Sequence, residues 1–215
     1  IFKALAPVIP DRVIAGHHAD LGIAMFHGLV ARERRLFIGS SGPLGGGWGA
    51  KHNQDGVSAT VCLNDGDTHN TPVELTENKY TMMIENHSLI PNSCGAGRNR
   101  GGLGIEYTVR ALSDFNLTTR SERSQCLPWG LDGGLEAAGN EVALRLNGEW
   151  KDDLPNAKVL ALGLKQGDAY RMRSGGGGGF GAPRERSVEA VVDDVRQGYV
   201  SIEAAAALYG VVVDE

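Results

Sequence analysis

Glycine is the residue that most constrains what this chain can fold into. The segment SGGGGGFGAP, from Ser174 to Pro183, contains five consecutive glycines, and 31 of the 215 residues are glycine, about twice the usual share of roughly 7%. Apolar residues (41%) and charged residues (22%) occur at ordinary globular frequencies. The chain is therefore expected to fold and to place its glycines at turns, bulges and close backbone contacts.

The five-glycine run lacks the features of a phosphate-binding loop. A Walker-type loop needs a Lys followed by Ser or Thr after its glycines, because these side chains reach the phosphates and magnesium. Neither residue follows the run. The run lies where the apolar period changes from two residues to 3.6, so we predict a tight, ordered turn that leads from the last strand into a helical tail.

Strand signals dominate before the run, and helix signals follow it. Val142, Leu144 and Leu146 alternate with polar residues, and Asn147-Gly148 is typical of a hairpin turn. After the run, valines recur with helical spacing from residue 188 to residue 195, behind Ser187 as the N-cap. We predict an α+β fold in a single domain, with a β-rich body over residues 1–183 and two short helices in a tail over residues 184–215.

Charge and cysteine usage exclude several classes of protein. The net charge is −5 and the pI is about 5.7, so a nucleic-acid or anionic-membrane partner is disfavoured. The two short helices expected in the tail could suggest a DNA-binding helix-turn-helix, but the basic residues that such a motif needs are missing. No apolar stretch is long enough to cross a membrane. The three cysteines are widely spaced and form no CxxC pair, which indicates reduced thiols in a cytoplasmic protein.

Three loops carry the candidate site residues. In GGGWGAKHNQDG, His52 and Asp55 could orient each other or contribute to a metal site, although such a site needs at least three ligands and a solvated turn is the alternative. In HNTPVELTE, Glu74 and Glu77 could act as general bases beside Asn70, or simply form a polar loop and helix start. The candidate catalytic residues are therefore His52, Asp55, Glu74 and Glu77.

The third loop is NSCGAGRNRGGLG. Arg98 and Arg100 are bracketed by glycines, so their guanidinium groups and the nearby amides could seat a carboxylate or phosphate. Together with Asn70 they are the candidate substrate- or anion-binding residues. Cys94 lies beside them, and a structural use of this thiol is favoured over a nucleophilic one.

These three loops, followed by PWGLDGG and by the tail from Ser174 to Val211, occur in an order and spacing that resemble the C-terminal part of the hydantoinase B/oxoprolinase family. The resemblance covers nearly the whole chain. It implies a component of an ATP-dependent cyclic-amide hydrolase, acting on a hydantoin, lactam or 5-oxoproline. An A-type partner subunit would use ATP and Mg²⁺ to phosphorylate the carbonyl oxygen, and a divalent metal in the complex would take its ligands from outside this chain.

The resemblance also sets limits. Family subunits are much longer, so we expect an N-terminal B-type portion to act with this chain, whether the chain is a split subunit, a processed product or a piece of a longer protein. At Asn92 and Cys94 the family commonly has Asp and Gly, so this loop lacks a carboxylate. The alternatives are a subunit of an ATP-dependent ketone carboxylase of the acetone or acetophenone type, and a non-catalytic structural subunit.

Overall fold

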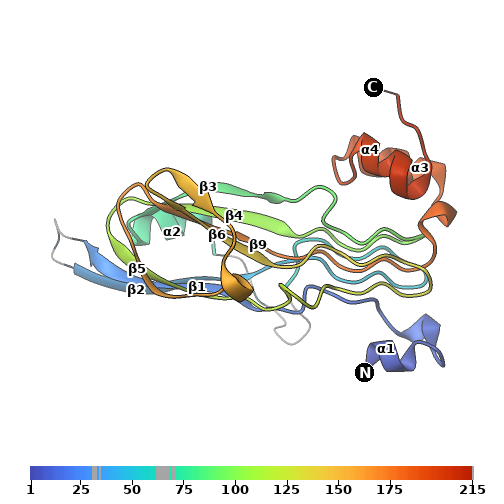
Figure 1. Cartoon of the computed structure of the whole chain (residues 1–215), viewed down its shortest axis with the longest axis horizontal. Coiled ribbons are helices and arrows are strands. Elements are labelled where there is room, and N and C mark those ends of the chain that lie inside the picture. Colours follow the sequence, from blue (N-terminus) through green and yellow to red (C-terminus); the bar gives the residue numbers. More distant parts are fainter. Residues whose placement is uncertain (31–32, 34, 62–67, 69–70, 215) are drawn as a thin grey trace.

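The computed structural model describes residues 1–30, 33, 35–61, 68 and 71–214 (Figure 1). Two antiparallel sheets form one end of the molecule. The first sheet has the strand order β2-β1-β5-β8 and the second has the order β3-β4-β9-β6-β7. The first sheet comprises β1 (Gly22–Val30), β2 (Arg35–Leu44), β5 (Phe115–Arg120) and β8 (Val159–Leu164). The second comprises β3 (Met82–Leu89), β4 (Ile105–Ala111), β6 (Glu141–Leu146), β7 (Glu149–Lys151) and β9 (Ala169–Arg173).

The two sheets pack face to face around a shared apolar core. Phe26, Phe37 and Phe115 project inward from the first sheet, with ring centroids 6.1–6.4 Å apart. Val109 and Tyr170 of the second sheet are fully buried in the same cluster. Alternating inward and outward residues along β1 and β5 produce this arrangement, because successive side chains of a strand point to opposite faces. The α+β prediction is confirmed.

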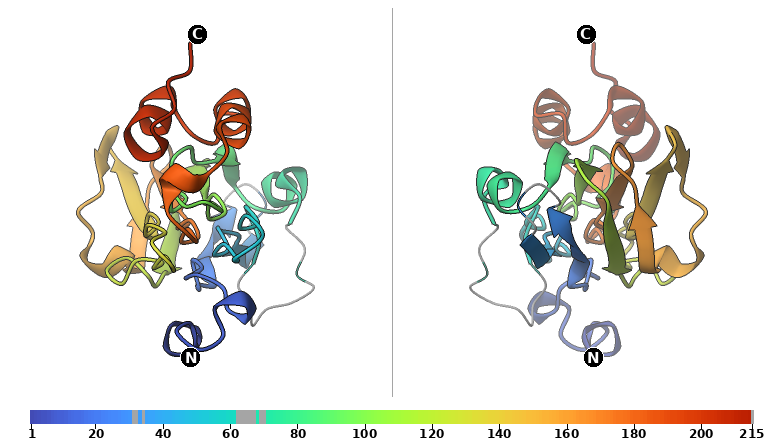
Figure 2. Two further views of the ribbon diagram at one scale, coloured as in Figure 1. Left: turned by 90° about the vertical axis from the view of Figure 1, so that its right-hand side faces the viewer. Right: turned by 90° about the vertical axis from the view of Figure 1, so that its left-hand side faces the viewer.

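Short helices complete the chain. α1 (Phe2–Leu5) lies at the N-terminus and α2 (Val73–Lys79) lies beside the sheets. α3 (Val188–Arg196) and α4 (Ile202–Ala204) follow near the C-terminus, where α4 continues as one π-helical turn over Ala205–Tyr209. Figure 2 shows α1 and the C-terminal helices on opposite sides of the molecule. Among the described residues, no helix has the length and apolar character needed to cross a bilayer.

Local sequence signals at the hairpin and the helix caps are confirmed. The Asn147-Gly148 pair joins β6 to β7 with φ values of 53° and 88°, as a two-residue hairpin turn requires. The Ser187 side chain accepts a hydrogen bond from the backbone N–H of Ala190, and Ser201 caps α4 in the same way. These caps satisfy amides that the helix itself leaves unpaired.

The glycine-rich segments form the second part of the body, a bundle of extended chains that run side by side between the sheets and the tail (Figure 1). We call it the glycine bundle; it comprises residues 15–18, 45–50, 93–104, 128–138 and 174–181. Hydrogen bonds to the same neighbouring chain recur every third residue. Written donor to acceptor, they are Gly176 to Ala138 and Gly179 to Leu135, Gly177 to Gly102 and Phe180 to Asn99, and Gly47 to Gly175 and Ala50 to Gly178.

A period of three residues with bonds between chains is typical of polyproline II helices, which form no internal hydrogen bonds. Such chains approach one another closely only where side chains are absent. A Cβ atom at Gly177 would overlap the backbone carbonyl of Trp48, and one at Gly178 would overlap that of Trp129. The bundle therefore requires glycine at these positions for space.

The predicted turn at the five-glycine run is wrong. Residues 174–181 are all buried and run as an extended chain with neighbours on several sides. The run does lie between β9 and the helical tail, as its position predicted. Five glycines in a row are compatible with a turn, and only the contacts from four distant segments show that they form the centre of a bundle.

Candidate functional site

Two carboxylates, of the half-buried Asp55 and the buried Asp194, tie the glycine bundle to the helical tail. Asp55 accepts hydrogen bonds from both Nη atoms of Arg186, each at 2.8 Å, and from the backbone N–H of Arg100 at 2.9 Å. Asp194 of α3 accepts from Nε of Arg100 at 2.7 Å and from Nε of Arg186 at 2.9 Å. Asp194, Arg100 and Arg186 are each less than 10% exposed, so these four residues form a continuous ion network.

The electrostatics of this network favour the charged forms. Burial opposes a charge on Arg100 and Arg186, but hydrogen bonds and attraction from Asp194 and Asp55 outweigh it and raise the pKa of both guanidinium groups. Both Asp55 oxygens already accept from a guanidinium group. This arrangement positions the tail on the bundle and leaves Asp55 and Arg100 little freedom to engage a ligand.

Arg98 and His52 lie at the edge of the same network. Nη1 of Arg98 lies 3.2 Å from Glu185, and its Nη2 donates to the backbone carbonyl of His52 at 3.4 Å. Nδ1 of His52 is buried and has no hydrogen-bond partner within the described part of the chain. The structure thus brings four predicted site residues together, namely His52, Asp55, Arg98 and Arg100.

Cys94 is packed close to this network. Loss of solvent around the half-buried thiol, offset in part by Arg100, raises the pKa of Cys94 to about 11. A thiol with that pKa stays protonated at neutral pH and is a poor nucleophile. This result supports the structural use expected for Cys94.

The remaining predicted residues lie elsewhere. Glu74 and Glu77 belong to α2, beside the sheets and far along the molecule from α3 (Figure 1). Oε1 of Glu77 accepts from the backbone N–H of Ile84 at 2.9 Å, which holds α2 against β3. Glu74 is exposed. Asn70 lies outside the described residues.

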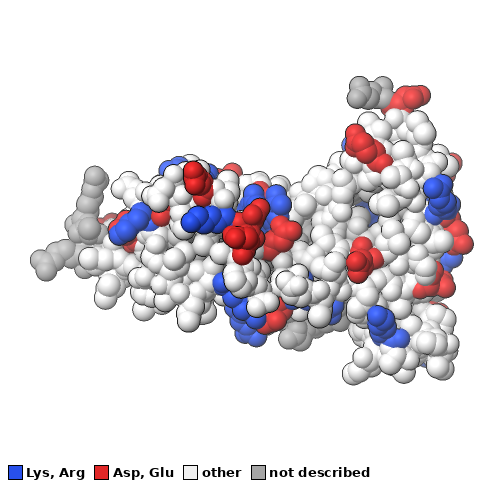
Figure 3. All heavy atoms as spheres, in the orientation of Figure 1, with Lys and Arg blue, Asp and Glu red and all other residues white. Residues whose placement is uncertain are grey.

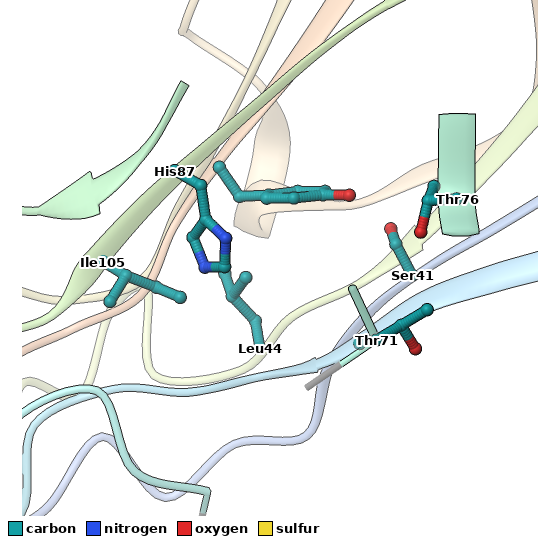
Figure 4. Close-up of a pocket in the computed structure, with 8 residues that line it drawn as sticks. Ser41, Leu44, Thr71, Thr76, His87 and Ile105 are labelled. Atoms are coloured by element: carbon teal, nitrogen blue, oxygen red, sulfur yellow. The ribbon is translucent and has the colours of Figure 1, made fainter. Parts of the chain in front are cut away.

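A small pocket opens beside α2, between the two sheets (Figure 4). Its volume is about 40 Å³, which is room for a water molecule or a small polar group. Ser41 and Thr76 project their hydroxyl groups toward each other, while the His87 ring lies between Ile105 and Leu44. The full lining is Ser41, Gly42, Leu44, Thr71, Thr76, His87, Ile105 and Tyr107.

Tyr107 gives this pocket a hydroxyl group that remains a hydrogen-bond donor at neutral pH. Burial, with a smaller contribution from the charge of Glu77, raises the pKa of Tyr107 to about 12, so its hydroxyl stays protonated at neutral pH. The Tyr107 ring meets the His87 ring edge to face, with centroids 5.3 Å apart. Hydroxyl groups and an imidazole can both donate and accept hydrogen bonds, which suits a ligand with one acceptor and one donor, such as an amide.

Sequence reasoning missed this pocket. Its residues come from β2, α2, β3 and β4, and no two adjacent residues combine into a recognisable motif. Serine and threonine are also common on any surface. The nearest signal was the Glu74/Glu77 pair, which identified the correct helix without identifying Thr76 between the two carboxylates.

A second buried polar cluster, around His18 and Asp20, has a structural character. Oδ2 of Asp20 accepts from the Ser121 hydroxyl, the Glu122 backbone N–H and the Asn140 side chain, at 2.8–3.0 Å. Nε2 of His18 lies 3.0 Å from the carbonyl oxygen of Thr60. Burial lowers the pKa of His18 to about 4, so the ring is neutral at physiological pH.

The described residues contain no group of three or more His, Cys, Asp or Glu side chains that could hold a metal ion. His52 and Asp55 are near each other without a third ligand. The residues that the structure describes therefore do not fit a metal centre of their own, and no chemical step is assigned to a metal on them.

The chain is similar to known proteins over most or all of its length. A family model described as hydantoinase B/oxoprolinase matches residues 1–183. An uncharacterised protein of Methanocaldococcus jannaschii is 35% identical over 210 residues, which is 95% of this chain and 34% of that protein. A putative D-/L-hydantoinase B-type subunit from a Pseudomonas strain is 28% identical over 220 residues, 100% of this chain and 36% of that protein.

Two solved structures share the fold. The crystal structure of ATP-dependent caprolactamase from Pseudomonas jessenii matches with a TM-score of 0.83 and 28% identity, over 99% of this chain and 38% of that chain. The nucleotide-free structure of acetone carboxylase matches with a TM-score of 0.78 and 21% identity, over 98% of this chain and 32% of that chain. The chain spans about a third of the length of each of these four proteins.

Proposed function

Because this chain belongs to the hydantoinase B/oxoprolinase family, we propose that it is part of an ATP-dependent cyclic-amide hydrolase. The observation that carries the proposal is the match of 99% of the chain to a caprolactamase at 28% identity and a TM-score of 0.83. A cyclic amide is the substrate class named by that structure. The substrate proposed here is accordingly a lactam, a hydantoin or 5-oxoproline.

The proposed reaction needs more than this chain. An amide carbonyl is a poor electrophile, and phosphorylation of its oxygen converts that oxygen into a leaving group. ATP and Mg²⁺ are assigned to an A-type partner subunit that performs this step, and a divalent metal would take its ligands from an N-terminal B-type portion. The proposal places the complex in the cytoplasm, where ATP is available, and expects no activity from this chain alone.

This chain would contribute the small pocket beside α2 and the glycine bundle. The pocket has room for the amide group of a substrate and not for its ring. His87 and Tyr107 can donate to the carbonyl oxygen. The hydroxyls of Ser41, bonded to Tyr170, and of Thr76, which donates to the carbonyl of Pro72, can still accept from the N–H. Glu74 and Glu77 remain the proposed general bases; they lie on α2 on either side of Thr76, which lines this pocket. In this proposal Arg98 and His52 form an anion-facing edge of the bundle, whereas Asp55 and Arg100 mainly hold the tail.

We further propose that residues 1–215 act as one domain. The tail from residue 184 onward shares the Asp55–Arg186–Asp194–Arg100 network with the body. Its apolar residues Val191, Val200 and Tyr209 pack in one cluster with Ala96 of the glycine bundle. A tail held by both charge and apolar contacts is expected to unfold with the body.

The test is reconstitution with the A-type and N-terminal B-type components. Hydantoin, caprolactam and 5-oxoproline are offered in turn, and we expect at least one to stimulate ATP hydrolysis and to be opened. His87→Ala and Tyr107→Phe should lower kcat at least about tenfold, while Ser88→Ala, next to His87 on the same strand, should not. If no cyclic amide stimulates ATP hydrolysis in the complete complex, the proposal is refuted.

A ketone carboxylase is the second candidate, because the acetone carboxylase structure shares this fold over 98% of the chain. The two reactions differ in their co-substrate. Product formation that depends on bicarbonate and a ketone, with no ring opening of amides, would select the carboxylase. A complex whose turnover is unaffected by changes at His87, Tyr107, Glu74 and Arg98 would instead favour a structural role.

A further inference from the structure

The outer surface of the first sheet is an apolar face without a partner among the described residues. It is formed by side chains that point away from the core on β1, β2 and β8. Leu29 pairs with Leu36, and His27 pairs with Ile38, across the β1–β2 hairpin. We define the apolar face as Met25, Leu29, Leu36, Ile38 and Leu160.

These side chains are strongly exposed. Leu36 is 76% exposed, Ile38 81% and Leu160 85%. From Leu36 to Leu44, β2 contains no charged residue, and the visible surface over β1, β2 and β5 is largely free of charge in Figure 3. Met25, Leu29, Leu36 and Ile38 lie on the neighbouring strands β1 and β2, and Leu160 lies on the far side of β5. Exposed apolar surface of this kind marks an interaction site in soluble proteins.

The position of β2 strengthens this interpretation. β2 is the outermost strand of the first sheet, so one row of its backbone groups has no neighbouring strand in that sheet. Soluble proteins usually protect such edges with lysines, bulges or a covering element. A ten-residue edge strand that carries Leu36 and Ile38 on its outer face is expected to be covered in the working assembly.

The outer face of the second sheet differs in character. Nε of Arg110 lies 2.7 Å from Glu85, and Nη2 of Arg145 lies 3.1 Å from the same carboxylate. Nε of Arg173 lies 2.7 Å from Glu106. These cross-strand ion pairs satisfy one another in water, so this face needs no partner. The two sheets therefore present one apolar and one charged surface.

We propose that the apolar face docks against an apolar surface of the remaining part of a hydantoinase B-type protein. The chain matches 34% of the M. jannaschii protein and 38% of the caprolactamase chain over nearly its own full length, so about two thirds of each relative lies outside the match. That remainder is the occupant, whether it belongs to the same polypeptide or to a separate one. The proposal depends on family membership and not on the reaction catalysed.

The experiment uses this full chain and one defined partner. The chain is tagged and co-expressed with a shortened P. jessenii caprolactamase polypeptide. This polypeptide lacks the segment that corresponds to the present chain. We compare wild type with Ile38→Lys and with Val212→Lys. Ile38 and Val212 are 81% and 80% exposed, so the two changes are matched in exposure, and lysine is tolerated on edge strands.

The expected result is a soluble complex with the wild-type chain, at least a tenfold lower affinity for Ile38→Lys, and an unchanged affinity for Val212→Lys. Methionine oxidation gives a second measurement. Met25 and Met83 are 46% and 42% exposed in the free chain, so both should oxidise there, and Met25 alone should be protected in the complex. Thermal melts of the free variants should match that of wild type, which shows that both fold.

Three results would overturn the proposal. The first is that no soluble partner co-purifies with the tagged wild-type chain. The second is a complex that binds Ile38→Lys as well as Val212→Lys, or that leaves Met25 fully reactive. The third is that the free wild-type chain forms a dimer and the Ile38→Lys variant does not. A second copy of the chain would then be the occupant of the apolar face. A complex that forms correctly but opens no cyclic amide would refute the proposed function and leave this inference intact.

Discussion

Replacing Gly177 with alanine should destabilise the protein more than any ordinary surface change. The new methyl group would overlap the Trp48 carbonyl and would lie 2.6 Å from the backbone nitrogen of Gly49. Carbon contacts normally require about 3.5–4.0 Å, so relief of the overlap with the Trp48 carbonyl would require the two chains to separate by roughly 1.5 Å. Both colliding groups are backbone, and neither can rotate away.

The cost follows from the hydrogen bonds that such a separation would break. Two bonds join the chains directly, from Gly47 to Gly175 and from Ala50 to Gly178, each at 2.9 Å. Gly102 bridges them, since it accepts from Gly177 and donates to Trp48, so one of its two bonds would also be lost. An increase of roughly 1.5 Å takes each of these three bonds beyond hydrogen-bonding distance. Three bonds at about 1 kcal/mol each give a loss of about 3 kcal/mol, against a total stability of about 5–15 kcal/mol.

The assay is urea and thermal unfolding followed by circular dichroism. For a chain of this size, about 3 kcal/mol corresponds to a fall in Tm of roughly 6–12 °C. Gly163→Ala in β8 is the matched control, because the nearest atom to its new Cβ is Asn116 Oδ1 at 3.9 Å; its stability should change by less than about 1 kcal/mol. A Gly177→Ala protein within about 1 kcal/mol of wild type, or equal to Gly163→Ala, would refute the close-packed bundle.

Three further predictions test the buried groups. Asp194→Asn should cost about 3–5 kcal/mol by leaving Arg100 and Arg186 undercompensated and should expose the tail to protease, whereas Asp193→Asn should do neither; equal digestion of the two variants would contradict the network. Burial lowers the pKa of His18 from 6.5 to about 4, so the unfolded state takes up a proton first and stability should fall as the pH drops from 6.5 toward 4. His18 should contribute a loss of about 2 kcal/mol between about pH 7 and pH 5, and His17, whose pKa burial also lowers to about 4, adds its own contribution. In denaturant unfolding His18→Gln should remove the His18 share; a pH dependence that this change leaves intact would contradict the assignment. Because the pKa of Cys94 is raised to about 11, its alkylation at about pH 8 in a Cys62→Ser background should be on the order of 100-fold slower than that of exposed Cys126, and comparable rates would show that Cys94 is not desolvated.

Several local elements and the family could be predicted from the residues alone. Alternation at Val142, Leu144 and Leu146, the Asn147-Gly148 turn and the Ser187 cap are written in neighbouring residues, and each is confirmed. The order of five motifs, four of them glycine-rich, identified the family because it combines short patterns over nearly the whole chain. The roles predicted for His52, Asp55, Glu74, Glu77, Asn70, Arg98 and Arg100 stay predictions.

Tertiary structure alone decided what the glycines do and where the pocket lies. The five-glycine run resembles a turn in sequence because nothing local distinguishes a bend from an extended chain that lacks side chains. Its partners at residues 16, 47, 102 and 138 are distant in sequence, and hydrogen bonds between such segments leave no periodic apolar signal. The pocket of Ser41, Thr76, His87 and Tyr107 arises in the same way, because its lining comes from β2, α2, β3, β4 and the segment before α2. Asp55 and Arg100 looked available for chemistry until the fold placed Arg186 and Asp194 against them, since charge pairing across more than 90 residues depends on the folded chain.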